Sequence, residues 1–123
     1  FRHSASNRMV IDANSRISLS NNDSGTSNTI FGKNAGASLD AGSNYNVFIG
    51  ENVSDAAMND ALYNVGIGYE ALSALTTGDG NVAIGLTAGQ ATQAVSNTVL
   101  IGVEAVCCDL TQLEVASVVV LDR

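Results

Sequence analysis

Short apolar runs recur along the chain with a 17–18-residue period, and each begins with asparagine and ends with glycine. The runs are NTIFG, NVFIG, NVGIG, NVAIG and NTVLIG, which begin at Asn28, Asn46, Asn64, Asn81 and Asn97. Their closing glycines are Gly32, Gly50, Gly68, Gly85 and Gly102, and the fifth run carries one extra residue. Such a period is typical of stacked repeats, in which each copy covers the apolar face of the next.

Each run predicts a strand that is apolar on both faces. The second position is β-branched in every copy: Thr29, Val47, Val65, Val82 and Thr98. The fourth position is large and apolar: Phe31, Ile49, Ile67, Ile84 and, in the fifth copy, Leu100 or Ile101. These two positions share a face, and the residue between them is also apolar or small: Ile30, Phe48, Gly66, Ala83 or Val99. We expect one face to cover the interior of its own coil and a second or third chain to cover the other.

The ends of each run have their own expected roles. Asparagine suits a tight corner, where it bonds nearby backbone and tolerates left-handed geometry, and stacked asparagines predict a ladder along the rod. Glycine suits a corner with positive φ or a close approach of backbone. A small apolar residue follows each glycine by three positions: Ala35, Val53, Ala71, Ala88 and Ala105. The limb around these residues fits a short strand or a single helical turn equally well. The fold class is therefore all-β, a repetitive parallel β-solenoid or β-roll with 17–18-residue turns.

The chain divides into three expected segments. Residues 1–27 are a connector, in which residues 8–20 alternate apolar and polar across a turn and predict a hairpin or two short strands. Residues 28–106 are the five-copy rod. Residues 107–123 are a β-prone strand that leads to the next module. Because the sequence lacks an initiator Met and stops after an apolar run, we expect it to be a piece of a longer polypeptide.

Charge and hydropathy exclude two classes of partner. The chain of 123 residues carries 12 acidic and 5 basic side chains, a net charge of −7, and between Lys33 and Arg123 there is no basic residue. Nucleic acids and anionic membrane surfaces require clustered Lys or Arg, so neither is expected to bind. No apolar run reaches the length of about 18 residues that a membrane span needs, so we expect no membrane insertion.

Candidate chemical motifs are few. Residues 66–71 read Gly-x-Gly-x-x-Ala, but they belong to the repeat and not to a strand–helix unit, so a dinucleotide loop is rejected. Cys107 and Cys108 are adjacent and are expected to be partly buried thiols, with interchain disulfides as the alternative. His3 is the only histidine, and no nearby Ser or Cys forms the setting that a catalytic base needs.

Acidic residues fall mainly in the expected turns, at Asp23, Asp40, Asp55, Asp60 and Asp79. Calcium binds in the acidic turns of some solenoids, but the repeated G-G-x-G-x-D pattern is missing here, so solvated turn residues are the favoured interpretation. We therefore expect no catalytic residue, no cofactor and no metal site.

The repeated segment NVGIGYEALSALTTGDGNVAIGLTAG resembles repeats of bacteriophage tail fibres and of the head domains of trimeric autotransporter adhesins. The preceding segment, NRMVIDANSRISLSNNDSGTSNTIFGKNAG, resembles the lead-in to such repeats in phage and marine viral fibres. The resemblance covers about residues 8–106 and implies a parallel, intertwined homotrimer used in attachment. Adhesin heads often have shorter coils than the 17–18-residue turns of this chain, which leaves the cross-section open.

The expected function is that of a structural segment in a trimeric viral tail fibre or surface adhesin, located on the virion or the cell surface. Its expected partners are two further copies of itself, adjoining fibre modules, and a glycan or protein of the host surface. One alternative is a polysaccharide-binding or polysaccharide-degrading β-solenoid, which needs paired carboxylates and aromatic platforms. Another is an ice- or mineral-binding solenoid, which needs a flat array of Thr or Asp; Thr29 and Thr98 are isolated cases of such a pattern.

Overall fold

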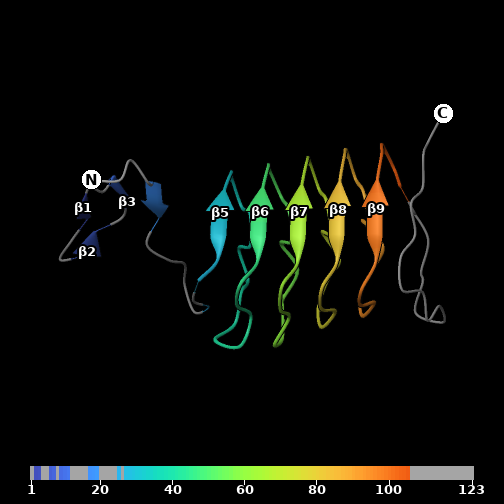
Figure 1. The fold of residues 1–123 in the computed structure, drawn as a ribbon, viewed down its shortest axis with the longest axis horizontal. Helices are drawn as coiled ribbons and strands as arrows, with labels where there is room; N and C mark the ends of the chain where they lie inside the picture. The colour runs from blue at the N-terminus through green and yellow to red at the C-terminus, as the bar shows by residue number, and fades with distance from the viewer. Residues whose placement is uncertain are drawn as a thin grey trace.

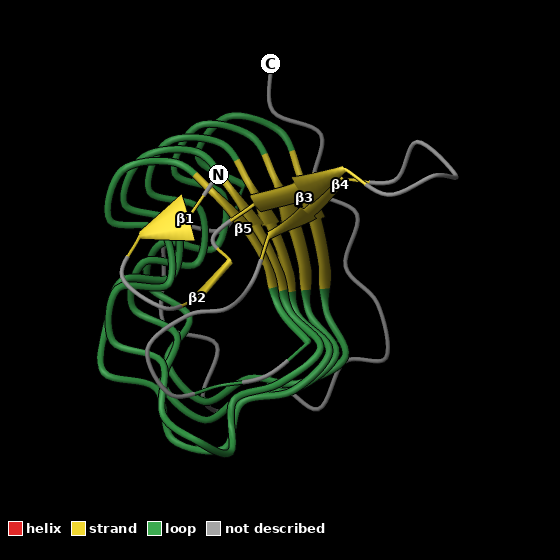
Figure 2. Cartoon of the chain, turned by 90° about the vertical axis from the view of Figure 1, so that its left-hand side faces the viewer, coloured by secondary structure: helices red, strands yellow, loops and turns green. Residues whose placement is uncertain are grey.

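The computed structural model is an all-β protein built around a β-solenoid of about four turns (Figure 1). It describes residues 2–3, 6–7, 9–11, 17–19, 25 and 27–105. Five parallel strands lie side by side in chain order: β5 (Thr29–Phe31), β6 (Val47–Ile49), β7 (Val65–Ile67), β8 (Val82–Ile84) and β9 (Val99–Ile101). Figure 2 looks along the stack and shows that the coils superimpose. The predicted parallel β-solenoid with 17–18-residue turns is therefore confirmed.

Strand pairing gives the register of the repeat. Thr29 pairs with Val47, Val47 with Val65, Val65 with Val82 and Val82 with Val99. The first three steps match the sequence prediction, but in the fifth copy Val99, and not Thr98, occupies the second position. Leu100 is then the middle residue and Ile101 the fourth. The extra residue of that copy lies before the strand, so Asn97 is displaced from the position that the other asparagines share.

A buried ladder of asparagines stabilises one corner of the coils. The Oδ1 atom of Asn46 accepts hydrogen bonds from the backbone N of Asn64 at 2.8 Å and from its Nδ2 at 3.1 Å. Asn28 and Asn64 accept the same pair of bonds from the next asparagine. Each Nδ2 also donates to a backbone carbonyl of its own coil, as Asn64 does to Gly78 at 2.8 Å. The amide groups are thus satisfied although Asn46, Asn64 and Asn81 are at most 1% exposed.

Thr98 ends this ladder in the place where the sequence predicts Asn97. The Thr98 hydroxyl and backbone N donate to Oδ1 of Asn81 at 2.7 and 3.2 Å, and Thr98 is 1% exposed. Asn97 is exposed and has a φ of 60°. Left-handed geometry therefore belongs to the residue before the ladder position, whereas the ladder asparagines do not have positive φ, contrary to their expected conformation.

The closing glycines bring the coils into contact at a second corner. Their φ values lie between 132° and 143°, a region that side chains rarely adopt. A Cβ atom on Gly32, Gly50, Gly68 or Gly85 would lie 2.1–2.4 Å from the carbonyl oxygen of the next glycine. Both expected reasons for glycine, positive φ and close approach, are therefore confirmed.

This corner predicts a sharp difference between two Gly→Ala substitutions. Gly68→Ala places a methyl group 2.3 Å from the Gly85 carbonyl oxygen in a strained conformation, so unfolding should become easier by roughly 1–3 kcal/mol. Gly42→Ala is the control, because Gly42 does not have positive φ and the 1.5 Å approach of its Cβ to Oδ1 of Asp60 involves an exposed, flexible side chain that can rotate away. Urea denaturation at equal chain concentration measures both. Equal midpoints for the two variants would show that the glycine corner does not require close packing.

The interior is filled by side chains whose sizes complement those of the neighbouring coils. Phe48 is fully buried and lies next to two glycines: a Cβ on Gly36 would be 3.2 Å, and one on Gly66 3.4 Å, from its ring. Leu72 in the following coil is also fully buried, and Gly89 of the coil after that makes room for it. Small residues at the position three after each closing glycine complete the core: Ala35, Val53, Ala71, Ala88 and Ala105. Large residues face small ones, as close packing requires.

The second limb of the coil is neither a strand nor a helix but a series of tight turns. Bonds from N–H to the carbonyl three residues earlier recur there, as from Leu75 to Leu72 at 2.9 Å. Residues two and four positions after the closing glycine have positive φ, such as Glu70 at 52° and Leu72 at 55°. Backbone bonds also join neighbouring coils along this limb, including Leu72 N to Ala88 O at 3.0 Å.

Only one face of each strand is buried by the chain itself. The middle residues of β6 to β9 are buried, whereas the outward residues Phe31, Ile49 and Ile101 remain 66%, 38% and 40% exposed. The expectation of strands covered on both faces is therefore met on the coil side and not met on the outer side within one chain.

Short antiparallel pairs precede the solenoid. β1 (Arg2–His3) pairs with β2 (Ser6–Asn7), and β3 (Met9–Ile11) pairs with β4 (Ile17–Leu19). The second pair matches the hairpin expected within residues 8–20, and the first pair was not expected. The predicted strand at residues 107–123, with Cys107 and Cys108, lies outside the described residues, as does Asp23.

Candidate functional site

The outer surface of β5 to β9 is the strongest candidate for an interaction site, and we call it the strand face. It consists of the first and third residues of each strand, which point away from the core because side chains alternate. These residues form two rows along the rod: Thr29, Val47, Val65, Val82 and Val99, and Phe31, Ile49, Ile67, Ile84 and Ile101. Every residue except Thr29 is a large apolar side chain, and all are exposed or half-buried.

Exposed apolar side chains gather at this face and its two edges. Among residues 27–105, eight large apolar side chains are exposed. Three of them, Phe31, Ile49 and Ile101, are the third residues of strands. Two lie two positions before a strand, namely Tyr45 and Tyr63. The other three lie two positions after a strand, namely Tyr69, Leu86 and Val103. A contiguous apolar surface of this kind is typical of protein interaction sites.

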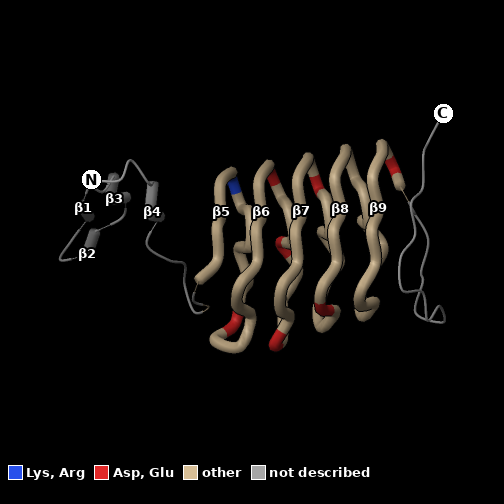
Figure 3. The backbone as a smooth tube through the Cα atoms, in the orientation of Figure 1, with Lys and Arg blue, Asp and Glu red and all other residues tan. Residues whose placement is uncertain are grey.

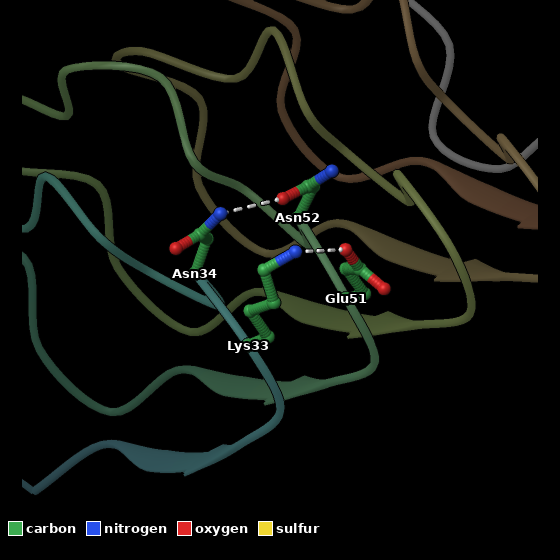
Figure 4. A network of polar contacts seen from close by, with 4 residues as sticks. All are labelled: Lys33, Asn34, Glu51 and Asn52. Atoms are coloured by element: carbon green, nitrogen blue, oxygen red, sulfur yellow. Dashed lines mark hydrogen bonds and ion pairs between the residues drawn. The ribbon is translucent and has the colours of Figure 1, made fainter.

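The edge that follows the strands changes character along the rod. In the first two coils it carries Lys33 and Glu51, whose Nζ and Oε1 atoms lie 2.9 Å apart (Figure 4). The bond to Glu51 raises the pKa of Lys33. Beside this pair, Nδ2 of Asn34 donates to Oδ1 of Asn52 at 3.0 Å (Figure 4). In the next three coils the position of Lys33 and Glu51 holds Tyr69, Leu86 and Val103. This edge is therefore charged at one end of the rod and apolar at the other.

The opposite edge carries two stacked tyrosines. The rings of Tyr45 and Tyr63 lie 5.2 Å apart between centroids, with an angle of 8° between their planes. Both residues have positive φ, 61° and 59°, and both are more than half exposed. Bulky residues rarely adopt this conformation, so these two positions are strained.

Acidic residues of the solenoid lie in its turns and not in the strands (Figure 3). The carboxylate of Asp40 accepts hydrogen bonds from the Ser43 hydroxyl and from the backbone N of Asp60. Oδ1 of Asp79 accepts a bond from the backbone N of Leu62 at 2.7 Å. These carboxylates therefore connect one coil to the next. In residues 27–105 no three His, Cys, Asp or Glu side chains gather in a way that would hold a metal ion.

The bond from Ser43 predicts a measurable pKa change at Asp40. It is the largest cause that holds the Asp40 pKa below its ordinary value of 3.8. A lowered pKa stabilises the fold above the unfolded-state value, and that contribution disappears as pH falls through the folded-state value. Ser43→Ala should therefore raise the Asp40 pKa toward 3.8, as read from an NMR titration of its carboxyl carbon. Ser38→Ala, at an exposed position, is the control, and an unchanged Asp40 pKa in Ser43→Ala would contradict the assignment.

The structure brings together nearly all of the repeat asparagines and glycines that the sequence singled out. Asn28, Asn46, Asn64 and Asn81 form the buried ladder, and the closing glycines from Gly32 to Gly102 form the close corner. Asn97 is the exception, since Thr98 replaces it. Thr98 is also turned inward and buried, so it does not contribute to the flat threonine array that an ice-binding face needs.

Sequence reasoning did not single out the tyrosine stack or the change of polarity along the far edge. Both lie at positions that vary from copy to copy and flank the repeated run. Aligning the copies of the repeat in columns places Tyr45 beside Tyr63, and Lys33 beside Glu51. That alignment is the signal that would have found them.

No family model, no curated protein and no solved structure matches this chain. The described part of the chain also contains no helix of the length and apolarity that crossing a membrane requires. The strand face and its edges are therefore the features from which a function is inferred.

Proposed function

We propose that this chain is a structural segment of a trimeric viral tail fibre or surface adhesin, which supports or mediates attachment to a host or cell. The observation that carries the proposal is the strand face, with its two in-register apolar rows left uncovered by a single chain. When three copies are placed around a common axis, each strand face is covered by the other two chains.

Side chains on the strand face suit close association along an axis. The row nearest the strand starts is valine in four of five coils, and in-register valines give a flat, regular surface. Parallel association places equal coils at equal height, so each valine meets valines. Burial of apolar surface contributes about 25 cal/mol for each Å² removed from water, and this term favours an assembly over an exposed sheet.

The remainder of the coil supports a rod-like role. Hydrogen bonds run from each coil to the next on every side: the strand pairs, the asparagine ladder and the turn limb. Such a stack resists bending and lengthens with each added repeat. A net charge of −7 for each chain keeps neighbouring rods apart. The virion or the cell surface is the proposed location of such a rod.

The mass of the whole chain in solution tests this proposal. Light scattering should give about three times the chain mass of 12.6 kDa, with no release of sugars from polysaccharide and no thermal hysteresis. A stable monomer that hydrolyses a polysaccharide would overturn the proposal in favour of an enzyme. A monomer that shows thermal hysteresis would overturn it in favour of an ice-binding protein.

A further inference from the structure

One column of residues lies at the corner where each coil enters its strand. It contains Ser27, Tyr45, Tyr63, Gly80 and Asn97, each two positions before the first residue of a strand. All have left-handed backbone, with φ between 58° and 66°. The backbone therefore has one shape at every level, and only the side chains differ.

The two tyrosines of this column have a strained backbone, and their exposed side chains do not pack in the core. Left-handed geometry is unfavourable for bulky residues, and backbone strain of this kind is concentrated at functional sites. Each ring packs on the other at 5.2 Å, while 53% of Tyr45 and 59% of Tyr63 remain exposed. Serine and asparagine occupy the same column elsewhere, so folding does not require an aromatic ring there.

The stack stops at Tyr63 because the next level is a glycine. The atoms nearest to a Cβ on Gly80 would all belong to Asn97, with Oδ1 at 2.8 Å, Cγ at 3.8 Å and the backbone N at 3.9 Å, so the Asn97 amide reaches the level of Gly80. One face of the Tyr63 ring lies against Tyr45, and residue 80 has no side chain to cover the other face. The exposed amide of Asn97 lies beside that level. An aromatic face next to a polar amide combines the two kinds of group that ligand sites use for packing and for orientation.

We propose that Tyr63, Gly80 and Asn97 form a binding site for a neutral pyranose sugar. The apolar face of the sugar ring packs on Tyr63 at the level of Gly80, and a ring hydroxyl bonds the Asn97 amide. A neutral sugar is favoured because Asp79 directly precedes Gly80, and because the described coils after Lys33 carry no basic side chain. This inference rests on the proposed attachment role and identifies the class of surface ligand.

NMR of the full chain with labelled tyrosines tests the site. The probes are the methyl glycosides of glucose, galactose and N-acetylglucosamine, with N-acetylneuraminic acid as the anionic comparison. At least one neutral probe should shift the Tyr63 ring signals and saturate at a dissociation constant on the order of 1 mM. The anionic sugar should leave them unchanged.

Gly80→Asn is the decisive variant, because asparagine already occupies this conformation at position 97, and the added side chain would fill the level beside Tyr63 and displace the Asn97 amide. It should weaken binding by at least about tenfold, as should Tyr63→Ala when the Tyr45 ring signals are followed instead, whereas Gln90→Ala in the second limb should not change binding. A Tyr63 signal that no neutral probe shifts, or full binding by Gly80→Asn, would overturn the sugar site.

The mass of the same samples separates this inference from the proposed function. If the protein is a trimer but no sugar shifts the Tyr63 signals, the sugar site is contradicted and the fibre role is retained. If the protein is a monomer that binds the sugar, the trimer is contradicted and the sugar site is retained.

Discussion

Asn64→Ala is expected to lower the free energy of unfolding by roughly 3–5 kcal/mol, a large part of the total for a domain of this size. The side chain is fully buried and takes part in four hydrogen bonds: its Nδ2 donates to Asn46 and Gly78, and its Oδ1 accepts from N and Nδ2 of Asn81. Alanine leaves the Gly78 carbonyl and the Asn81 backbone N without these partners. Buried polar groups that lose their partners cost about 1–3 kcal/mol each.

Two further variants make the Asn64 experiment specific. Asn59→Ala removes an exposed asparagine side chain and should change stability by less than about 0.5 kcal/mol. Asn64→Asp keeps the shape but buries a carboxylate beside two acceptors, so it should be strongly destabilising at neutral pH and less so where the carboxyl is protonated. Urea denaturation at one fixed chain concentration measures all three. Similar losses in Asn59→Ala and Asn64→Ala would contradict the role of the ladder.

Ile67→Asp is expected to dissociate the proposed trimer into single chains without unfolding the coil. Ile67 lies in the centre of the strand face and points outward, so three added carboxylates would meet in the interface. An uncompensated buried charge costs several kcal/mol, which corresponds to a dissociation constant raised by at least about 100-fold. Sedimentation should show the mass of one chain, and circular dichroism should retain its β signal because the coil interior is unchanged.

Ala57→Asp is the matched control for this substitution. It adds the same charge at an exposed turn position in the neighbouring coil, away from the strand face. Its mass should equal that of the unaltered protein. If Ile67→Asp keeps the mass of the unaltered protein, or if Ala57→Asp also dissociates, the strand face is not the contact surface.

Features that repeat could be predicted from the sequence, because the same structural requirement selects the same residue types in every coil. Successive copies of Asn, a β-branched residue and Gly defined the strands, their parallel pairing and the coil length. The asparagine ladder followed from stacking alone, since one coil spacing brings equal side chains within hydrogen-bonding distance. Glycines such as Gly68 were assigned correctly because both positive φ and close backbone contact exclude a Cβ.

Features that depend on a single copy could not be predicted in the same way. Asn97 was assigned to the ladder because the other copies have asparagine there. The coil instead needs a short, buried hydrogen-bonding side chain at the next position, and Thr98 provides it. The left-handed turns of the second limb include Glu70 and Leu72, residue types that carry no turn signal. Their backbone bonds to neighbouring coils fix these turns, and such contacts are not visible in a local sequence pattern.

Pairs that compensate each other were also hidden in the sequence. Gly66 interrupts an otherwise apolar row and by itself indicates weakness in a strand. In the fold its Cβ would lie 2.6 Å from Val53 and close to Phe48, so glycine is the residue that the neighbouring coil requires. The tyrosine stack was missed for the same reason, since the contact between Tyr45 and Tyr63 is recognised only when the two coils are aligned one above the other.

The reactivity of a thiol on the strand face tests most directly whether sister chains cover it. Val65→Cys, in a background with Cys107→Ser and Cys108→Ser, places one thiol in the central outward row, and Ala57→Cys places one at an exposed turn position. Alkylation of the assembled protein should be much slower at position 65 than at position 57, and the difference should vanish when Ile67→Asp is added. Equally fast alkylation of both thiols in the protein without Ile67→Asp would show that water reaches the strand face, and would contradict the proposed assembly.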